Sequence, residues 1–170
     1  MSSFASEIQS WHEFFALTGA ASATLIGLLF VAVSLRADIR SQAEDSYFRT
    51  VVNHNILSYI TVLLFSLYFV IPDLTPTSIA SPVIITAAVV FLTTVRNGMR
   101  LRTAREMEWE SFWWGFLVPA LCQLAAIVVG IALARNHPGA MGWFVAVIAF
   151  LITVPTINAW RLLLESHEES

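Results

Sequence analysis

Long apolar stretches alternate with short polar segments along the chain. No charged residue occurs between Glu13 and Arg36, or between Arg49 and Asp73. A helix that crosses the hydrocarbon core of a bilayer needs about 20 consecutive, mostly apolar residues. The pattern therefore predicts five membrane-spanning helices, at residues 14–35, 51–71, 79–95, 112–134 and 143–160. We expect an all-α fold in which residues 1–170 form one polytopic transmembrane bundle.

Prolines mark the predicted connections between spans. Pro72 and Pro76 fall between the second and third spans, and Pro138 falls between the fourth and fifth. Proline interrupts helices because it lacks a backbone N–H and its φ angle is fixed. Pro82 is expected in the first turn of the third span, which is predicted to be the shortest. The polar segment that follows this span can continue as a helix beyond the membrane surface.

The composition agrees with lipid as the solvent. Hydrophobic residues make up 57% of the chain and charged residues only 12%, whereas soluble domains carry about 25% charged residues. The mean hydropathy is +0.72. The single cysteine, Cys122, excludes an intrachain disulfide and a metal cluster built on cysteines. The N-terminal segment lacks the pattern of a cleaved signal peptide, so we expect the first span to be retained.

The arginines predict the orientation of the bundle. The chain has no lysine, and eight of its nine Lys and Arg residues fall on one predicted side: Arg36, Arg40, Arg49, Arg96, Arg100, Arg102, Arg105 and Arg161. Only Arg135 falls on the other. Loops rich in Lys and Arg stay in the cytoplasm. We therefore expect the N-terminus outside and the C-terminus in the cytoplasm, as an odd number of spans requires.

Two segments resemble a group of known sequences. The block TGAASATLIGLLFVAVSLR, residues 18–36, looks like the opening helix of small, uncharacterised bacterial integral membrane proteins. The ending NAWRLLLE, residues 158–165, is similar to theirs. This resemblance implies a multi-pass protein of the bacterial inner (plasma) membrane, and it implies no chemistry.

Small residues form a candidate packing face on the first span. Gly19, Ala23 and Gly27 recur every four positions, so they are expected on one side of the helix. Small residues allow two helix backbones to approach closely in a membrane. The face predicts a homo-oligomer interface or a pore wall. The alternative is packing against another span of the same chain.

The second span carries the candidate lining of a transport pathway: His54, Asn55, Ser58 and Thr61. Polar groups are costly in hydrocarbon and usually face the bundle interior or water. These residues can form a polar vestibule near the cytoplasmic side, where His54 can change its charge near neutral pH. Alternatively, His54 and its neighbours lie at the headgroup boundary or bond to an adjacent helix.

Charged residues near the span ends suggest two further surfaces. A ring of Glu13 side chains would suit cation selection at the outer mouth of an oligomeric pore. On the opposite side, four arginines are candidates for contact with lipid headgroups: Arg96, Arg100, Arg102 and Arg105. The same four arginines also set the topology, which is a sufficient role by itself, and they can dock a partner.

The sequence contains no recognised enzyme motif, such as HExxH, G-x-S-x-G or a nucleotide-binding glycine loop. We therefore expect no enzymatic activity, no cofactor, no bound metal and no nucleic-acid partner. No predicted span has a carboxylate or lysine near its middle, which argues against a proton-coupled pump. Two classes of function remain. The first is an oligomeric passive channel or transport pore, and the second is a non-catalytic accessory protein that binds another membrane protein.

Overall fold

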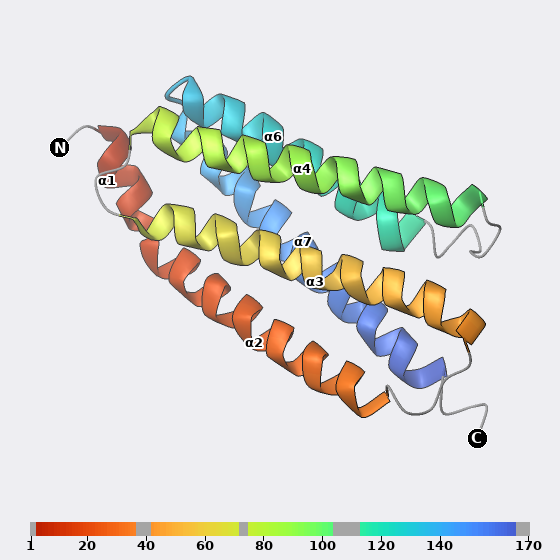
Figure 1. The fold of residues 1–170 in the computed structure, drawn as a ribbon. Helices are drawn as coiled ribbons and strands as arrows, with labels where there is room; N and C mark the ends of the chain where they lie inside the picture. The colour runs from red at the N-terminus through yellow and green to blue at the C-terminus, as the bar shows by residue number, and fades with distance from the viewer. Residues whose placement is uncertain (1–2, 37–41, 72–74, 104–112, 166–170) are drawn as a thin grey trace.

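The computed structural model describes residues 3–36, 42–71, 75–103 and 113–165, and these form a helical bundle (Figure 1). The described elements, in chain order, are α1 (Ser3–Ser10), α2 (His12–Arg36), α3 (Gln42–Val70), α4 (Pro76–Thr103), the π-helical turn η1 (Trp113–Leu117), α6 (Val118–Ala134), the 3-10 turn η2 (Pro138–Ala140) and α7 (Met141–Glu165).

Five of these helices are long and apolar enough to cross a membrane. Their spanning stretches are His12–Ser34, Arg49–Val70, Pro76–Arg100, Gly115–Ala134 and Met141–Trp160. The predicted all-α class and the number of spans are confirmed. The protein is therefore a multi-pass membrane protein by the length and composition of its helices.

The third span differs from its prediction at both ends. It was expected to be the shortest, but its stretch of 25 residues is the longest of the five. The helix begins at Pro76 because Thr75 and Ser78 cap it: each backbone N–H donates to the other residue's hydroxyl. Pro76 is thus the first helical residue, where its missing N–H costs little. Pro82 consequently lies inside α4 and not in its first turn.

The predicted turn between the fourth and fifth spans is present. After α6, Asn136 adopts a left-handed conformation with φ of 60°, which is a common way to end a helix. The backbone N–H of Arg135 donates to the carbonyl groups of Ile131 and Ala132. Pro138 then begins the 3-10 turn that leads into α7.

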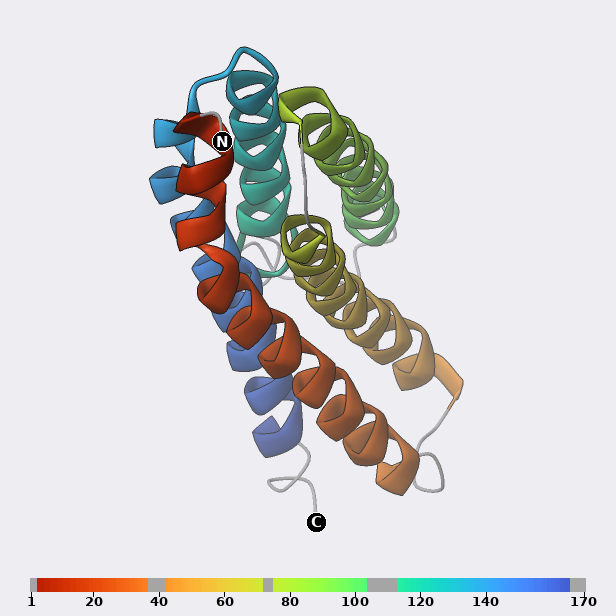
Figure 2. The ribbon, with the colours of Figure 1, turned by 90° about the vertical axis from the view of Figure 1, so that its left-hand side faces the viewer.

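Four helices form a ring in which each packs against the next. The sequence of contacts is α3 with α4, α4 with α6, α6 with α7, and α7 with α3, and the α4–α6 pair is the most extensive. Helix α2 packs on the outside of this ring against α3 (Figure 2). The short α1 contacts α2 and η2. Only 11% of the α2 span is buried, against 56% of the α3 span.

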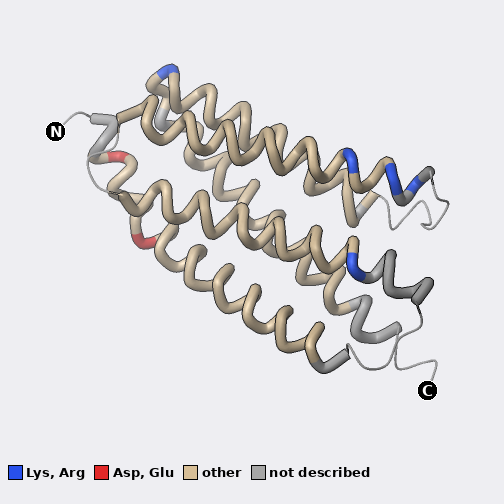
Figure 3. The backbone as a smooth tube through the Cα atoms, in the orientation of Figure 1, with Lys and Arg blue, Asp and Glu red and all other residues tan. Residues whose placement is uncertain are grey.

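Charged residues gather at the two ends of the bundle (Figure 3). One end, which we call the arginine-rich end, carries Arg49 at the start of the α3 span and Arg100 at the end of the α4 span. The other end carries Glu13 at the start of α2 and Arg135 after α6. Among the described residues, the helices between these ends are uncharged, as the sequence pattern predicted.

Aromatic side chains hold α2, α3 and α7 together near the end that carries Glu13. Phe15 stacks on Phe69 with ring centroids 4.3 Å apart, and Phe144 packs against Phe65 at 5.1 Å. All four rings are buried.

Candidate functional site

Several polar side chains are buried within the helix bundle, out of contact with the surroundings. We call six of them the polar interior: His54, Asn55, Ser58 and Thr61 on α3, Thr94 on α4, and Gln123 on α6. Each is at most 3% exposed. No Asp, Glu, Lys or Arg belongs to the buried residues in the described part of the chain. The polar interior therefore offers amide, hydroxyl and imidazole groups without a fixed charge.

Three contacts show which helix positions lie at the same depth. The rings of His54 and Phe116 stack with centroids 4.9 Å apart, which pairs α3 with η1. The hydroxyl groups of Tyr68 and Thr86 are 3.1 Å apart, which pairs α3 with α4. A Cβ atom built on Gly130 would lie 2.6 Å from Cγ1 of Ile84, which pairs α6 with α4.

These pairings place the polar residues in two groups along the bundle. With a rise of about 1.5 Å per residue, Thr61, Thr94 and Gln123 lie within about 5 Å of one another in depth. The same reckoning places His54 and Asn55 about 10 Å nearer the arginine-rich end. The polar interior thus extends from near that end to the middle of the bundle.

Much of the polar interior has no hydrogen-bond partner on the described protein. The unpaired atoms are both ring nitrogens of His54, both amide atoms of Asn55 and of Gln123, and the hydroxyl of Thr94. A buried group left without a partner costs about 1–3 kcal/mol. By contrast, Ser58 and Thr61 donate to the carbonyl groups of His54 and Leu57. A group that both donates and accepts hydrogen bonds would satisfy these unpaired atoms.

The polar interior ends at an aromatic contact near the arginine-rich end. Phe116 is 3% exposed and stacks on His54 at an interplanar angle of 27°. Phe116 belongs to the π-helical turn η1. Short π-helical segments are rare and occur frequently at functional sites.

The predicted small-residue face of the first span is divided by the structure. Gly19 is buried against α3, where an added Cβ would lie 3.0 Å from Cβ of Ser66. Thr18 bonds to the hydroxyl of Ser66 at 3.1 Å in the same seam. Ala23 and Gly27 are exposed, and an added Cβ on Gly27 meets nothing within 4 Å. Each step of four residues turns the face by about 40°, so Gly19 and Gly27 point in different directions.

The charged candidates lie at the bundle ends. Glu13 is exposed, and so are three of the four arginines proposed to contact headgroups, Arg96, Arg100 and Arg102. Arg105 lies outside the described residues. No group of three or more His, Cys, Asp or Glu side chains that would suit a metal ion occurs within the described ranges.

Two residues of the polar interior were missed by sequence reasoning. Gln123 is the only amide side chain in the Gly115–Ala134 stretch, the most hydrophobic of the five. That isolation was a usable signal, because a polar residue in the middle of a span is expensive and usually functional. Thr94 gave no comparable signal, since its neighbour Thr93 has the same side chain and is exposed. Only the packing of α4 distinguishes the two threonines.

Comparison with known protein families, curated protein sequences and solved structures finds no match for this chain.

Proposed function

We propose that this protein is a passive transport pore for small, uncharged polar molecules, with one pathway through each protomer. The observation that carries the proposal is the pair of buried amides, Asn55 and Gln123, which have no hydrogen-bond partner on the described protein. Both groups donate and accept hydrogen bonds. They would replace the hydration of a neutral solute at two depths, near the arginine-rich end and near the middle of the membrane.

The absence of charge in the polar interior favours a neutral solute. An ion in a low-dielectric interior needs a counter-charge or a dense shell of oxygen ligands. The buried residues in the described part of the chain include no fixed charge. An amide-lined and hydroxyl-lined passage instead suits water, urea, glycerol or a molecule of similar chemistry.

The burial of the predicted lining favours a pathway inside the protomer. His54, Asn55, Ser58 and Thr61 are all 3% exposed or less within a single chain. A pore on the axis of an oligomer would need them on an outer surface. In our proposal the stack of His54 on Phe116 closes the pathway at the arginine-rich end, and transport requires this contact to open.

A liposome assay tests the transport proposal. Purified protein is reconstituted, and the uptake of water, urea and glycerol is followed by stopped-flow light scattering. We expect faster uptake of at least one solute than in empty liposomes, and a reduction of at least fivefold in Gln123→Leu and Thr94→Val. Thr93→Val is the matched control, because Thr93 is exposed and bonds only to carbonyl groups of its own helix. Uptake of every solute at the rate of empty liposomes would refute the proposal. Equal uptake rates in Thr94→Val and Thr93→Val would also refute it.

A second candidate function is that of an accessory protein for another membrane protein. The observation that favours it is the outer face of α2, which is the least buried span and exposes Ala20, Ala23 and Gly27. Small residues let a helix from a partner, or from a second copy, approach closely. An absence of solute flux together with a stable complex formed through this face would favour this function over transport.

We further propose that the protein lies in a bacterial inner membrane with its arginine-rich end in the cytoplasm. The distribution of arginine supports this orientation. Single cysteines introduced at Asn136 and Arg100, in a Cys122→Ala background, test it with an impermeant thiol reagent. In intact cells, we expect the reagent to label only the cysteine at position 136. Labelling of only the cysteine at position 100 would indicate the opposite orientation.

A further inference from the structure

The side of α3 that carries the polar interior changes character toward the end with Glu13. His54, Ser58 and Thr61 are separated by four and three residues, so they lie on one side of the helix. The next position on this side is Phe65, which lies about 6 Å beyond Thr61 along the helix axis and is fully buried. A molecule that follows this side of α3 from the arginine-rich end therefore meets imidazole and hydroxyl groups first and an aromatic ring next.

Phe65 belongs to a group of four buried rings, which we call the aromatic cluster: Phe15 on α2, Phe65 and Phe69 on α3, and Phe144 on α7. The ring of Phe144 contacts all three others. Its centroid is 5.1 Å from that of Phe65, 5.4 Å from that of Phe69 and 6.1 Å from that of Phe15. Loss of the Phe144 ring would therefore remove a contact from each of the other three.

The other two helices of the ring add apolar side chains at the same depth. The contacts of α4 with α3 and with α6 described above place Ala87, Ala126 and Val129 level with Phe65 and Phe69. All three are buried. Neither these side chains nor the aromatic cluster has a group that forms conventional hydrogen bonds. A polar solute at this depth would lose its hydration and find no replacement on these side chains.

An apolar segment of this kind controls transport through its width. Hydrophobic constrictions act as gates because water leaves them when they are narrow. The buried hydroxyl of Ser66, next to Phe65 in the sequence, does not change this, because it bonds to Thr18 in the seam with α2. A wider constriction should therefore admit water and larger polar solutes.

We propose that the aromatic cluster is the outer gate of the pathway and that Phe144 sets the size of the largest solute that passes. Because it acts on the same pathway, this gate rests on the transport function proposed above. The pathway then has two closures. The stack of His54 on Phe116 closes the arginine-rich end, and the aromatic cluster closes the half toward Glu13.

The test compares the wild type with Phe144→Ala and Phe150→Ala in the liposome assay. Phe150 is the matched control, because it lies on the same helix and its ring is exposed. We expect Phe144→Ala to take up glycerol at least threefold faster than the wild type and to admit erythritol, a larger polyol that the wild type excludes. Phe150→Ala should behave as the wild type does. A ring with a purely structural role would leave this size limit unchanged.

A second substitution shows whether the gained uptake passes through the polar interior. Gln123→Leu in the Phe144→Ala background should reduce the uptake at least fivefold, because the solute still has to pass Gln123. If Phe144→Ala does not give a monodisperse helical protein, Phe144→Leu removes the ring contacts but keeps an apolar side chain. It should change the uptake in the same direction.

The outcomes separate a failure of the gate from a failure of the transport function. Wild-type uptake that is equal to the uptake by Phe144→Ala would overturn the gate and leave the transport function standing. A gain in Phe144→Ala that Gln123→Leu does not reduce would also overturn the gate, because the solute would then leak outside the polar interior. Uptake at the rate of empty liposomes in every protein would refute the transport function and the gate with it.

Discussion

The close approach of α4 and α6 makes Gly130 the position most sensitive to a single added methyl group. In Gly130→Ala the new Cβ would lie 2.6 Å from Cγ1 of Ile84 and 3.5 Å from Cγ1 of Val83. Carbon atoms pack at about 3.5–4.0 Å, so one helix must move by about 1 Å or Ile84 must change its rotamer. Isoleucine has one strongly preferred χ1 rotamer in a helix, which makes the second response costly.

The expected loss of stability can be estimated from these two responses. Overpacking by a methyl group costs about 1–3 kcal/mol. Alanine also has a higher helix propensity than glycine, by about 1 kcal/mol, which partly offsets the clash. Gly27→Ala isolates the propensity effect, because its added Cβ meets nothing within 4 Å. We therefore expect Gly130→Ala to be about 1–3 kcal/mol less stable than Gly27→Ala.

The assay is reversible unfolding in mixed micelles, in which sodium dodecyl sulfate is titrated and tryptophan fluorescence reports the folded fraction. A double-mutant cycle then identifies the cause of the loss. Ile84→Ala removes the clashing Cγ1, so it should restore at least 1 kcal/mol when combined with Gly130→Ala. Ile84→Val keeps a carbon at that position and should not restore stability.

Two results would refute this reasoning. Equal stability of Gly130→Ala and Gly27→Ala would mean that α4 and α6 are farther apart than described. A loss that Ile84→Ala does not relieve would mean that the cost arises from another contact.

Three further predictions concern contacts of α2, α3 and α7. Phe15→Ala removes a fully buried ring and should lower the free energy of unfolding by about 3 kcal/mol in the same assay. Phe30→Ala is the control, because its ring is 69% exposed, and it should change stability by less than about 0.5 kcal/mol. Equal losses would contradict the described packing of α2. Tyr59→Phe should cost about 0.5–1.5 kcal/mol, since it removes the hydroxyl that bonds α3 to α7, and a neutral effect would argue against that bond. Under the proposal that α2 associates through its exposed small residues, Gly27→Leu should weaken that association, measured by native mass spectrometry, without lowering protomer stability. Gly19→Leu should instead destabilise the protomer itself, because α3 lies against Gly19; the reverse pattern would place Gly27 inside the protomer.

The sequence correctly predicted where the helices lie, and the errors are confined to their ends. Spans are local features, because roughly 20 apolar residues must satisfy their own backbone hydrogen bonds when they cross lipid. The start of α4 was mispredicted because Pro76 was taken as a breaker in the turn. The reciprocal hydrogen bonds of Thr75 and Ser78 make it the first residue of the helix. The polar character of α3 was also readable, and its four candidate residues all lie in the polar interior.

The tertiary structure decided which side of each helix faces inward. In water, apolar residues mark the buried face of a helix, but in lipid the outer face is equally apolar, so hydrophobicity no longer distinguishes the two. This is why the spacing of Gly19, Ala23 and Gly27 suggested one common face, whereas packing places Gly19 against α3 and leaves Gly27 exposed.

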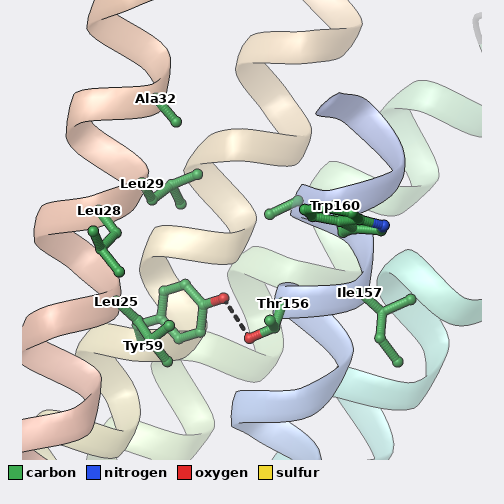
Figure 4. Close-up of a pocket in the computed structure, with 9 residues that line it drawn as sticks. Leu25, Leu28, Leu29, Ala32, Tyr59, Thr156, Ile157 and Trp160 are labelled. Atoms are coloured by element: carbon green, nitrogen blue, oxygen red, sulfur yellow. Dashed lines mark hydrogen bonds between the residues drawn. The ribbon is translucent and has the colours of Figure 1, made fainter. Parts of the chain in front are cut away.

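The same limitation applies to the polar interior and to the apolar groove between α2 and α7. Gln123 is far from His54 in the sequence. Both are buried because α6 and α3 pack within one helix bundle. The apolar groove is lined by α2 and α7, from opposite ends of the chain, with Tyr59 of α3 between them (Figure 4). The sequence by itself thus determined a five-span membrane protein with an arginine-rich end, through short-range requirements of length and polarity. Helix packing, which depends on side-chain shape over long sequence separations, decided where its polar interior and its apolar groove lie.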